Sequence, residues 1–159
     1  MAGTCPGTAG LDIGAKEGGA LGTLADQDTS VDSLFCDFFG HAAKTSTGSV
    51  VLAQACNARL ITGYCWRRDD GRYVIEFEPD IPVPDRKDRD PLALWGAAQE
   101  YTRRCEAKVR QHPEQWVWMH RRWRSPMEVD STGWQSRLAG ACSERIHAWI
   151  AAGRPELKA

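Results

Sequence analysis

The stretch LITGYCWRRDDGRYVIEFE, residues 60–78, is the strongest local indication of structure in the chain. Its centre holds Asp70-Gly71, a pair favoured in the tight turns of β-hairpins. Beyond that pair, large apolar side chains alternate with other residues over 73–77, which is the period of a β-strand. The sequence therefore predicts a β-hairpin whose first strand covers residues 60–66.

The segment before this hairpin predicts a buried strand, an aromatic stretch and a short helix. Residues 20–25 are small and mostly apolar and end at Asp26, as expected for a strand buried on both faces of a parallel sheet. The aromatic-rich residues 33–40 fit either a short strand or a packed loop. Thr47 is a candidate N-cap for a helix that follows it.

The segment after the hairpin predicts a long amphipathic helix. Asp90-Pro91 is a typical start, and the helix should end near Gln111 because the next residue precedes a proline. A second helix is expected over 134–150. The apolar positions that recur at spacings of three and four in the first helix are Leu94, Ala98, Tyr101, Cys105 and Val109.

The order strand, helix, strand, strand, helix predicts an α/β domain with a mixed sheet, a β-hairpin and C-terminal helices. With 159 residues, the chain is expected to form one compact domain at most. Residues 1–10 are rich in Gly, Ala and Thr, and we expect a disordered or mis-started terminus there. No apolar run approaches the roughly 18 residues of a spanning helix, so no transmembrane segment is predicted.

The charge distribution and the cysteine pattern limit the kinds of site that the sequence predicts. The formal net charge is only -1, but seven basic and two acidic residues lie between Tyr101 and Arg124. None of the six cysteines forms a Cys-x-x-Cys pair or a zinc-like Cys/His cluster, so we expect reduced thiols, no metal site and no cofactor. The basic residues of the segment are Arg103, Arg104, Lys108, Arg110, Arg121, Arg122 and Arg124.

Two parts of the chain resemble a known family. In the first part, ADQDTS follows the predicted strand at 20–25, and FCDFFG and KTSTG come after it. The second part is HPEQWVWMHRRW, residues 112–123. Together they resemble the bacterial lipid A biosynthesis acyltransferases, specifically the lauroyl/myristoyl branch. The resemblance covers residues 11–124, as the C-terminal part of such a domain, and leaves 125–159 as a helical tail.

The resemblance implies an enzyme that moves a fatty acyl group from acyl carrier protein to a hydroxyl of a lipid A precursor. Its partners would be acyl carrier protein, the lipid A precursor and the inner-membrane surface. Its location would be the cytoplasmic face of the bacterial inner membrane. No nucleic acid is expected as a partner.

The family's catalytic element is a histidine with an acid five positions later, and the histidine acts as general base on a weakly nucleophilic hydroxyl. No histidine of this chain has that spacing. In the family the pair lies upstream of Asp26, so we expect a fragment with no catalytic residue that is inactive alone. The residues five positions after His41, His112, His120 and His147 are Ser46, Val117, Ser125 and Ala152.

The candidate substrate-binding residues are Asp26, Gln27, Asp28, Arg121 and Arg122. The three polar residues follow a predicted strand, where ligands gather in open α/β sheets, but they also fit a simple polar turn. The two arginines suit phosphates and acidic sugars.

The tryptophan-rich segment that carries the arginines also fits a buried structural plug. In that alternative Glu114 pairs with Arg121 or Arg122.

Two other functions are compatible with the sequence. Basic residues interleaved with tryptophans fit a non-catalytic nucleic-acid-binding module, although such domains are usually distinctly basic overall. A relative that acylates another glycolipid, such as a mannosylated inositol lipid, is the other alternative.

Overall fold

The computed structural model describes residues 19–28, 33–85, 87–88, 91–125, 148 and 151–152. The prediction for residues 1–10 lies outside these residues. So does the predicted helix at 134–150, apart from residue 148.

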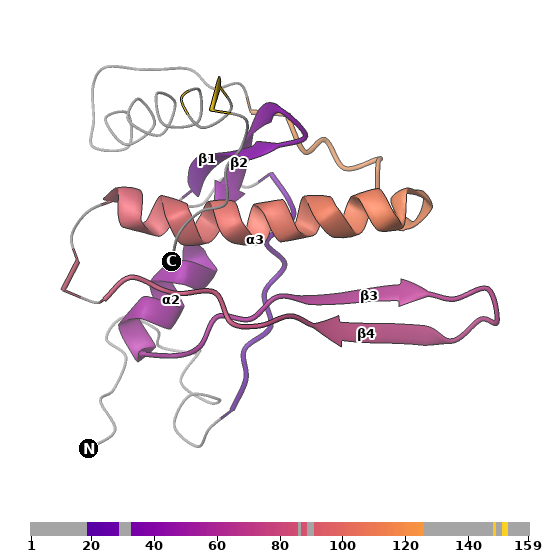
Figure 1. The fold of residues 1–159 in the computed structure, drawn as a ribbon, viewed down its shortest axis with the longest axis horizontal. Helices are drawn as coiled ribbons and strands as arrows, with labels where there is room; N and C mark the ends of the chain where they lie inside the picture. The colour runs from indigo at the N-terminus through magenta and orange to yellow at the C-terminus, as the bar shows by residue number, and fades with distance from the viewer. Residues whose placement is uncertain are drawn as a thin grey trace.

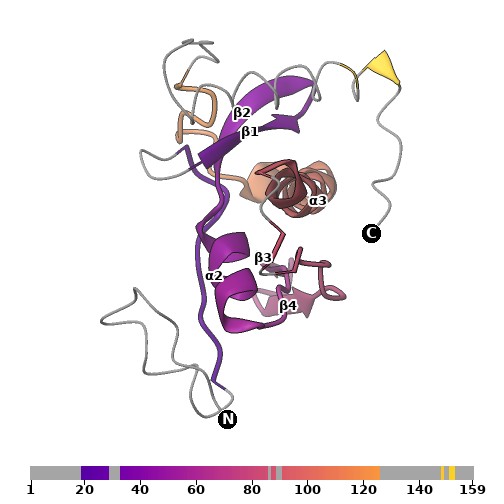
Figure 2. The same ribbon diagram turned by 90° about the vertical axis from the view of Figure 1, so that its left-hand side faces the viewer.

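In the described residues, two β-hairpins lie on opposite sides of one long helix, α3. Figures 1 and 2 show the β1–β2 hairpin on one side of α3, the β3–β4 hairpin on the other, and α2 beside them. The predicted α/β class is therefore confirmed. The elements are β1 (Ser33–Phe38), β2 (His41–Ser46), α2 (Gly48–Cys56), β3 (Gly63–Arg67), β4 (Tyr73–Phe77), α3 (Pro91–Gln111) and the 3-10 turn η1 (Pro113–Gln115).

The β3–β4 hairpin is confirmed, with a different turn from the one predicted. The backbone N–H of Arg68 donates to the carbonyl of Arg72 at 2.7 Å, which leaves a three-residue loop of Asp69, Asp70 and Gly71. Gly71 has φ +83°, the left-handed conformation of a turn that ends in a bulge. The place of the turn was readable from the sequence, but the extra loop residue was not.

The aromatic stretch at 33–40 is a strand followed by a tight turn. Phe39 (φ 57°) and Gly40 (φ 82°) both lie in the left-handed region, as in the two-residue turns that suit the twist of a hairpin. That conformation is costly for a phenylalanine. Contacts from α3 hold it, because Glu106 accepts the Phe39 N–H at 2.7 Å and the Arg110 guanidinium lies 4.5 Å from the ring centroid.

The amphipathic helix is confirmed as α3, and its apolar face forms most of the core. Ala98, Tyr101 and Val109 are buried, whereas Leu94 and Cys105 are only partly buried. The helix ends at Gln111, as the following proline predicted. The main cluster joins α3 to β1, α2 and the segment after β4 through Leu34, Phe35, Cys36, Val50, Ile81, Trp95, Ala97, Ala98 and Tyr101.

Two polar groups of α3 bind the backbone edge of β1. The Gln99 side chain accepts the Asp37 N–H at 2.8 Å and donates to the Asp37 carbonyl at 3.0 Å. One turn earlier, the Trp95 indole N–H donates to the Phe35 carbonyl at 3.0 Å. Four helical residues rise about 6 Å and two strand residues about 6.6 Å, so the two elements run nearly in register. The helix thus takes the place of a third strand beside β1.

The predicted strand at 20–25 is not formed. The segment is extended but joins neither sheet, and Leu21 and Leu24 are 57% and 83% exposed. A strand needs a partner with open backbone groups, and the β1 edge at Phe35 and Asp37 is occupied by α3 side chains. The four described strands form two antiparallel pairs in place of the single mixed sheet that the sequence suggested.

Helix α2 begins where predicted, but not through the predicted chemistry. Thr47 occupies the N-cap position, and its side chain makes no capping hydrogen bond. The hydroxyl of Ser46 instead accepts the Gly48 N–H at 3.2 Å. At the other end of the helix Cys56 is disulfide-bonded, so the expectation of reduced thiols is wrong there, although it holds for Cys36, Cys65 and Cys105. Sequence spacing cannot show which sulfurs meet in the folded chain.

The bond between Gln99 and Asp37 predicts a large loss of stability for Gln99→Met. The variant keeps the volume but leaves a buried N–H and a buried carbonyl without partners, at about 1–3 kcal/mol each. We expect urea unfolding to show a loss of about 2–4 kcal/mol. Arg103→Met on the exposed side of the same helix is the control and should lose under about 0.5 kcal/mol. A Gln99→Met loss as small as the control's would contradict the edge-closing role.

Candidate functional site

The two sequence motifs meet at Asp28. Its backbone N–H donates to Nε2 of His120 at 2.9 Å. Its carboxylate accepts the N–H and the hydroxyl of Ser125 at 2.8 and 3.0 Å, and the Arg124 guanidinium at 3.3 Å. Residues more than 90 positions apart are therefore joined by four hydrogen bonds, and the end of the tryptophan-rich segment is fixed against the polar turn.

The Asp28 carboxylate is fully covered and remains ionised. Burial alone raises its pKa, but the hydrogen bonds from Ser125 and the charge of Arg124 outweigh burial, so the pKa lies below its usual 3.8. With these bonds in place, Asp28 positions the segment more directly than it offers an oxygen to a ligand.

Arg122 points into the protein. It is 3% exposed and donates to the Lys44 carbonyl at 2.5 Å and to the Thr45 hydroxyl at 2.6 Å, with its guanidinium 5.4 Å from the Phe38 ring centroid. Burial lowers its pKa, yet an arginine starts high enough to stay charged. The side chain therefore fixes the tryptophan-rich segment to β2.

The expected ion pair of Glu114 is absent. Among the described residues, no ion pair joins Glu114 to Arg121 or Arg122. Its neighbour Gln115 carries the structural contact of this region, because it accepts the Arg67 N–H at 2.7 Å and donates to the Arg67 carbonyl at 2.8 Å. The amide of Gln115 thus holds β3 as the amide of Gln99 holds β1.

Arg121 is the exposed member of the predicted arginine pair, and it lines an open concavity of about 330 Å³. Planar guanidinium groups bind phosphate and carboxylate bidentately, and tryptophan supplies apolar surface beside them. The concavity therefore has the chemistry to receive an anionic group that carries an apolar part. Its other lining residues are Trp116, Trp118, His120, Arg122, Trp123 and Arg124.

Asp26 and Gln27 directly precede Asp28 in the chain and differ in exposure. Gln27 is exposed, whereas Asp26 is partly buried and close enough to Cys105 to act on its charge. Burial, reinforced by Asp26, raises the pKa of the Cys105 thiol to about 12. Cys105 is thus a protonated thiol at neutral pH, and it is no nucleophile.

The described histidines occupy three different environments. The ring centroids of His112 and Trp66 lie 4.9 Å apart in a stacked arrangement, and those of His41 and Trp123 lie 6.2 Å apart in an edge-on arrangement. His120 accepts the backbone N–H of Asp28. Within the described ranges no ion pair joins a histidine to a carboxylate. His147 lies outside the described residues.

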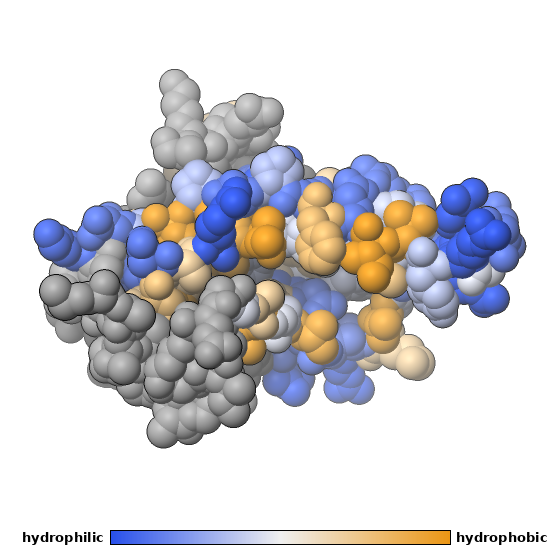
Figure 3. Space-filling model, turned by 90° about the horizontal axis from the view of Figure 1, so that it is seen from below, coloured by the Kyte–Doolittle hydropathy of each residue, from blue (hydrophilic) through white to orange (hydrophobic). Residues whose placement is uncertain are grey.

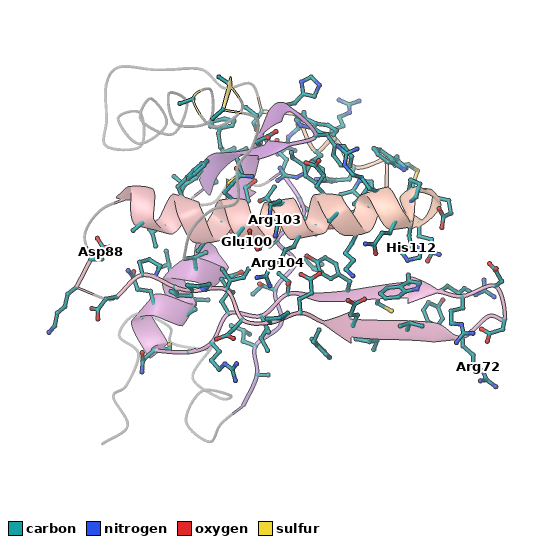
Figure 4. All side chains as sticks on the ribbon, viewed as in Figure 1. Arg72, Asp88, Glu100, Arg103, Arg104 and His112 are labelled. Atoms are coloured by element: carbon teal, nitrogen blue, oxygen red, sulfur yellow. The ribbon has the colours of Figure 1, made fainter. Side chains whose placement is uncertain are left out.

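The predicted basic face of α3 is matched by acids. Arg104 lies 2.7 Å from Glu100 and 3.6 Å from Glu78, and Lys108 lies 2.9 Å from Glu76. Figure 4 shows Arg103 and Arg104 beside Glu100. These contacts tie the β3–β4 hairpin to α3 and leave less positive charge for a phosphate backbone than the sequence suggested.

Two further observations bear on the chemistry of the described part of the chain. No group of three or more Cys, His, Asp and Glu residues there is placed to hold a metal ion. No described helix combines the length and the apolar character needed to cross a bilayer.

Sequence reasoning missed Ser125 and His120 as partners of Asp28. Neither carries a local signal, because a serine after a basic run and a histidine between tryptophans are ordinary surface patterns. The contact of Gln115 with the backbone of Arg67 was not foreseen either. Such pairs depend on segments that only the folded chain brings together.

Comparison with known proteins confirms the resemblance inferred from the motifs. The sequence model of the bacterial lipid A biosynthesis acyltransferases matches residues 14–125. The chain is also similar to the lipid A biosynthesis lauroyltransferase of Escherichia coli strain K12, with 28% identity over 122 residues. That alignment covers 75% of this chain and 38% of the relative, so the chain spans well under half of the relative's length.

The lowered pKa of Asp28 predicts a pH-dependent contribution to stability. An acid whose pKa is lower in the folded than in the unfolded state stabilises the fold above the unfolded value of about 4, and this contribution is lost as pH falls through the folded pKa. Asp28→Asn should therefore be less stable than the native chain at pH 7, and the difference should shrink at pH 3. Urea unfolding at pH 7, 5 and 3 measures this. A difference that does not change with pH would contradict it, and exposed Asp69→Asn is the control.

The burial of Arg122 predicts that the two adjacent arginines behave differently. Arg122→Met removes the donor to the Lys44 carbonyl and the Thr45 hydroxyl, so the free energy of unfolding should fall by about 2 kcal/mol or more. Arg121→Met at an exposed position should change it by under about 0.5 kcal/mol. Thermal melting of both variants tests this, and equal losses would show that the segment is not fixed through Arg122.

Proposed function

Because the chain belongs to the bacterial lipid A biosynthesis acyltransferase family, we propose that it forms the C-terminal part of an enzyme acting on lipid A precursors. The enzyme moves a fatty acyl group from acyl carrier protein to a hydroxyl of the precursor. The observation that carries this proposal is the family match over residues 14–125. It is supported by the hydrogen bonds that join Asp28 of the first motif segment to His120 of the second and to the two residues that follow it.

The anionic part of the acceptor binds at the concavity, with Arg121 as its main contact. A lipid A precursor carries phosphates and acidic sugars, which suit a guanidinium beside tryptophan surface. Gln27 and Asp26 offer hydrogen bonds to a substrate hydroxyl from the neighbouring turn. Asp28 and Arg122 serve binding indirectly, by holding the segment that carries Arg121.

Acyl transfer needs a base that this chain does not supply from its described residues. A general base takes the proton of the acceptor hydroxyl, the oxygen attacks the thioester carbonyl, and the thiol of the carrier leaves with a proton. Among the described residues, no carboxylate forms an ion pair with His41, His112 or His120. The chain alone therefore binds the acceptor without turning it over.

The acyl transfer takes place at the cytoplasmic face of the bacterial inner membrane, because the acceptor is a lipid. Nucleic acid is not a partner, since the cations of α3 are matched by acids.

The proposal predicts Arg121-dependent binding without turnover. The purified chain is titrated with a phosphorylated glucosamine lipid, and binding is followed by tryptophan fluorescence. Arg121→Ala should weaken binding by about tenfold or more, as expected for the loss of a charge-assisted hydrogen bond. With acyl carrier protein loaded with laurate or myristate, no acylated product should form.

The control is Arg103→Ala, which removes an exposed cation that does not line the concavity and should bind like the native chain. Equal binding by Arg121→Ala and the native chain would remove Arg121 from the site. Product formation by the native chain would overturn the proposed need for an outside base.

A further inference from the structure

In the β3–β4 hairpin, aromatic and charged side chains face α3, whereas three large apolar side chains of β4 face outward. Strand β4 turns Glu76 toward α3, where Lys108 lies 2.9 Å from its carboxylate. Lys108 also lies 5.7 Å from the ring centroid of Trp66, which shares this inner face. The hairpin is thus attached to the body largely by charges and aromatic rings.

The outer face carries the large apolar side chains. Tyr73, Ile75 and Phe77 are 69%, 65% and 72% exposed, and Ile61 extends the row with 55%. The Phe77 ring lies across Gly63, its register partner, where an added Cβ would come within 2.8 Å of the ring. Seen from the side opposite α3, apolar groups run along the molecule toward a hydrophilic end (Figure 3).

Single exposed apolar residues are ordinary, whereas adjacent apolar residues along one sheet face form a candidate contact surface. An antiparallel hairpin with one face on a protein body normally turns its apolar side chains inward. The reversal in β4 therefore indicates that something apolar covers the outer face.

The size of the face favours a lipid surface over a protein partner. Two paired strands of five residues cover about 17 Å by 10 Å, or roughly 170 Å². A stable interface between protein copies buries about 800 Å² on each side. A face this small and rich in aromatic and branched side chains suits shallow insertion into the boundary of a bilayer, where each side chain finds apolar surroundings separately.

The charges at the hairpin tip fit anionic headgroups. Arg67, Arg68 and Arg72 flank the turn, and Arg67 pairs in register with Tyr73, the outermost residue of the apolar row. Among the described residues, no carboxylate forms an ion pair with Arg67 or Arg72. Figure 4 shows Arg72 at the tip of the hairpin, extending away from α3. Tyrosine and arginine beside an apolar row are typical of residues at headgroup level.

We propose that the outer face of the β3–β4 hairpin is a membrane-docking surface, with Ile75 and Phe77 inserted into an anionic phospholipid bilayer and the tip arginines at its phosphates. This inference rests on the proposed membrane location of the activity and adds the element that makes the contact. Binding requires neither acyl donor nor acceptor.

The experiment is co-sedimentation with vesicles of phosphatidylethanolamine and phosphatidylglycerol, compared with vesicles of phosphatidylcholine alone. The native chain should bind the anionic vesicles, and the double variant Ile75→Ser/Phe77→Ser should bind about tenfold less. Met119→Ser is the matched control, because Met119 is a large apolar residue with 91% exposure outside the hairpin, and it should bind like the native chain. Circular dichroism shows whether each variant is folded.

A second measurement needs no substitution. Cys65 is a free, exposed thiol on the outer face, in register with Ile75. Its alkylation by iodoacetamide, read from its peptide by mass spectrometry, should slow several-fold when anionic vesicles are added. The result stands even if the double variant does not fold.

Several results would overturn the proposal. Vesicle binding with unchanged Cys65 alkylation would leave the membrane location standing but exclude this hairpin. An equal loss of vesicle binding in Met119→Ser and in the double variant would also exclude this hairpin while leaving the membrane location standing. No binding by the native chain would reject the hairpin and the proposed location together. Self-association of the native chain that the double variant abolishes would assign the face to a second copy.

Discussion

The structure depends on helix α3 completing the open edge of a strand. The amide of Gln99 satisfies both backbone groups of Asp37, and the indole of Trp95 satisfies the carbonyl of Phe35. Buried backbone groups without partners are costly, so an edge strand inside a core needs such cover. Because the rise of one helical turn nearly equals that of two strand residues, the fit extends over two consecutive positions. Once β1 is held, the core cluster between β1, α2 and α3 can close.

The same device recurs at the second hairpin, where Gln115 binds both backbone groups of Arg67. Here the contact is exposed, and ion pairs from Arg104 and Lys108 reinforce it. The two hairpins thus attach to one helix by different physics. The β1–β2 pair is bound through buried apolar packing, and the β3–β4 pair mostly through charge and ring contacts. The attachment of the β3–β4 pair leaves the apolar face of β4 exposed. No described residue packs over that face.

The candidate site shows how one motif divides its tasks between adjacent residues. In the tryptophan-rich segment, Arg122 is buried against β2 and Arg121 is exposed beside the concavity. Asp28 fixes the end of the same segment and is itself covered in doing so. A polar residue in a motif therefore need not touch a ligand. It can position the neighbour that does, and a buried arginine suits this task because it stays charged where other cations would lose their proton.

The sequence by itself determined the local elements and the family. Turn chemistry located the β3–β4 hairpin, apolar spacing located α3 and its end, and the motif letters identified the resemblance that the family match confirmed. It also marked the turn at Asp28 and the tryptophan-rich segment as the parts to examine. These features depend on neighbours within a few residues, or on letter patterns, so they are visible before folding.

Only the tertiary structure decided how the segments meet. Residues 20–25 pair with no described strand, because side chains of α3 already occupy the edge of β1. The fold turned Arg122 inward and left Arg121 outside, although the two are adjacent and chemically identical. It brought Glu76 and Glu78 to Lys108 and Arg104 of α3 and so reduced the apparent basic face. In each case the outcome depends on hydrogen bonds and charges between residues far apart in the chain, and no local periodicity encodes those distances.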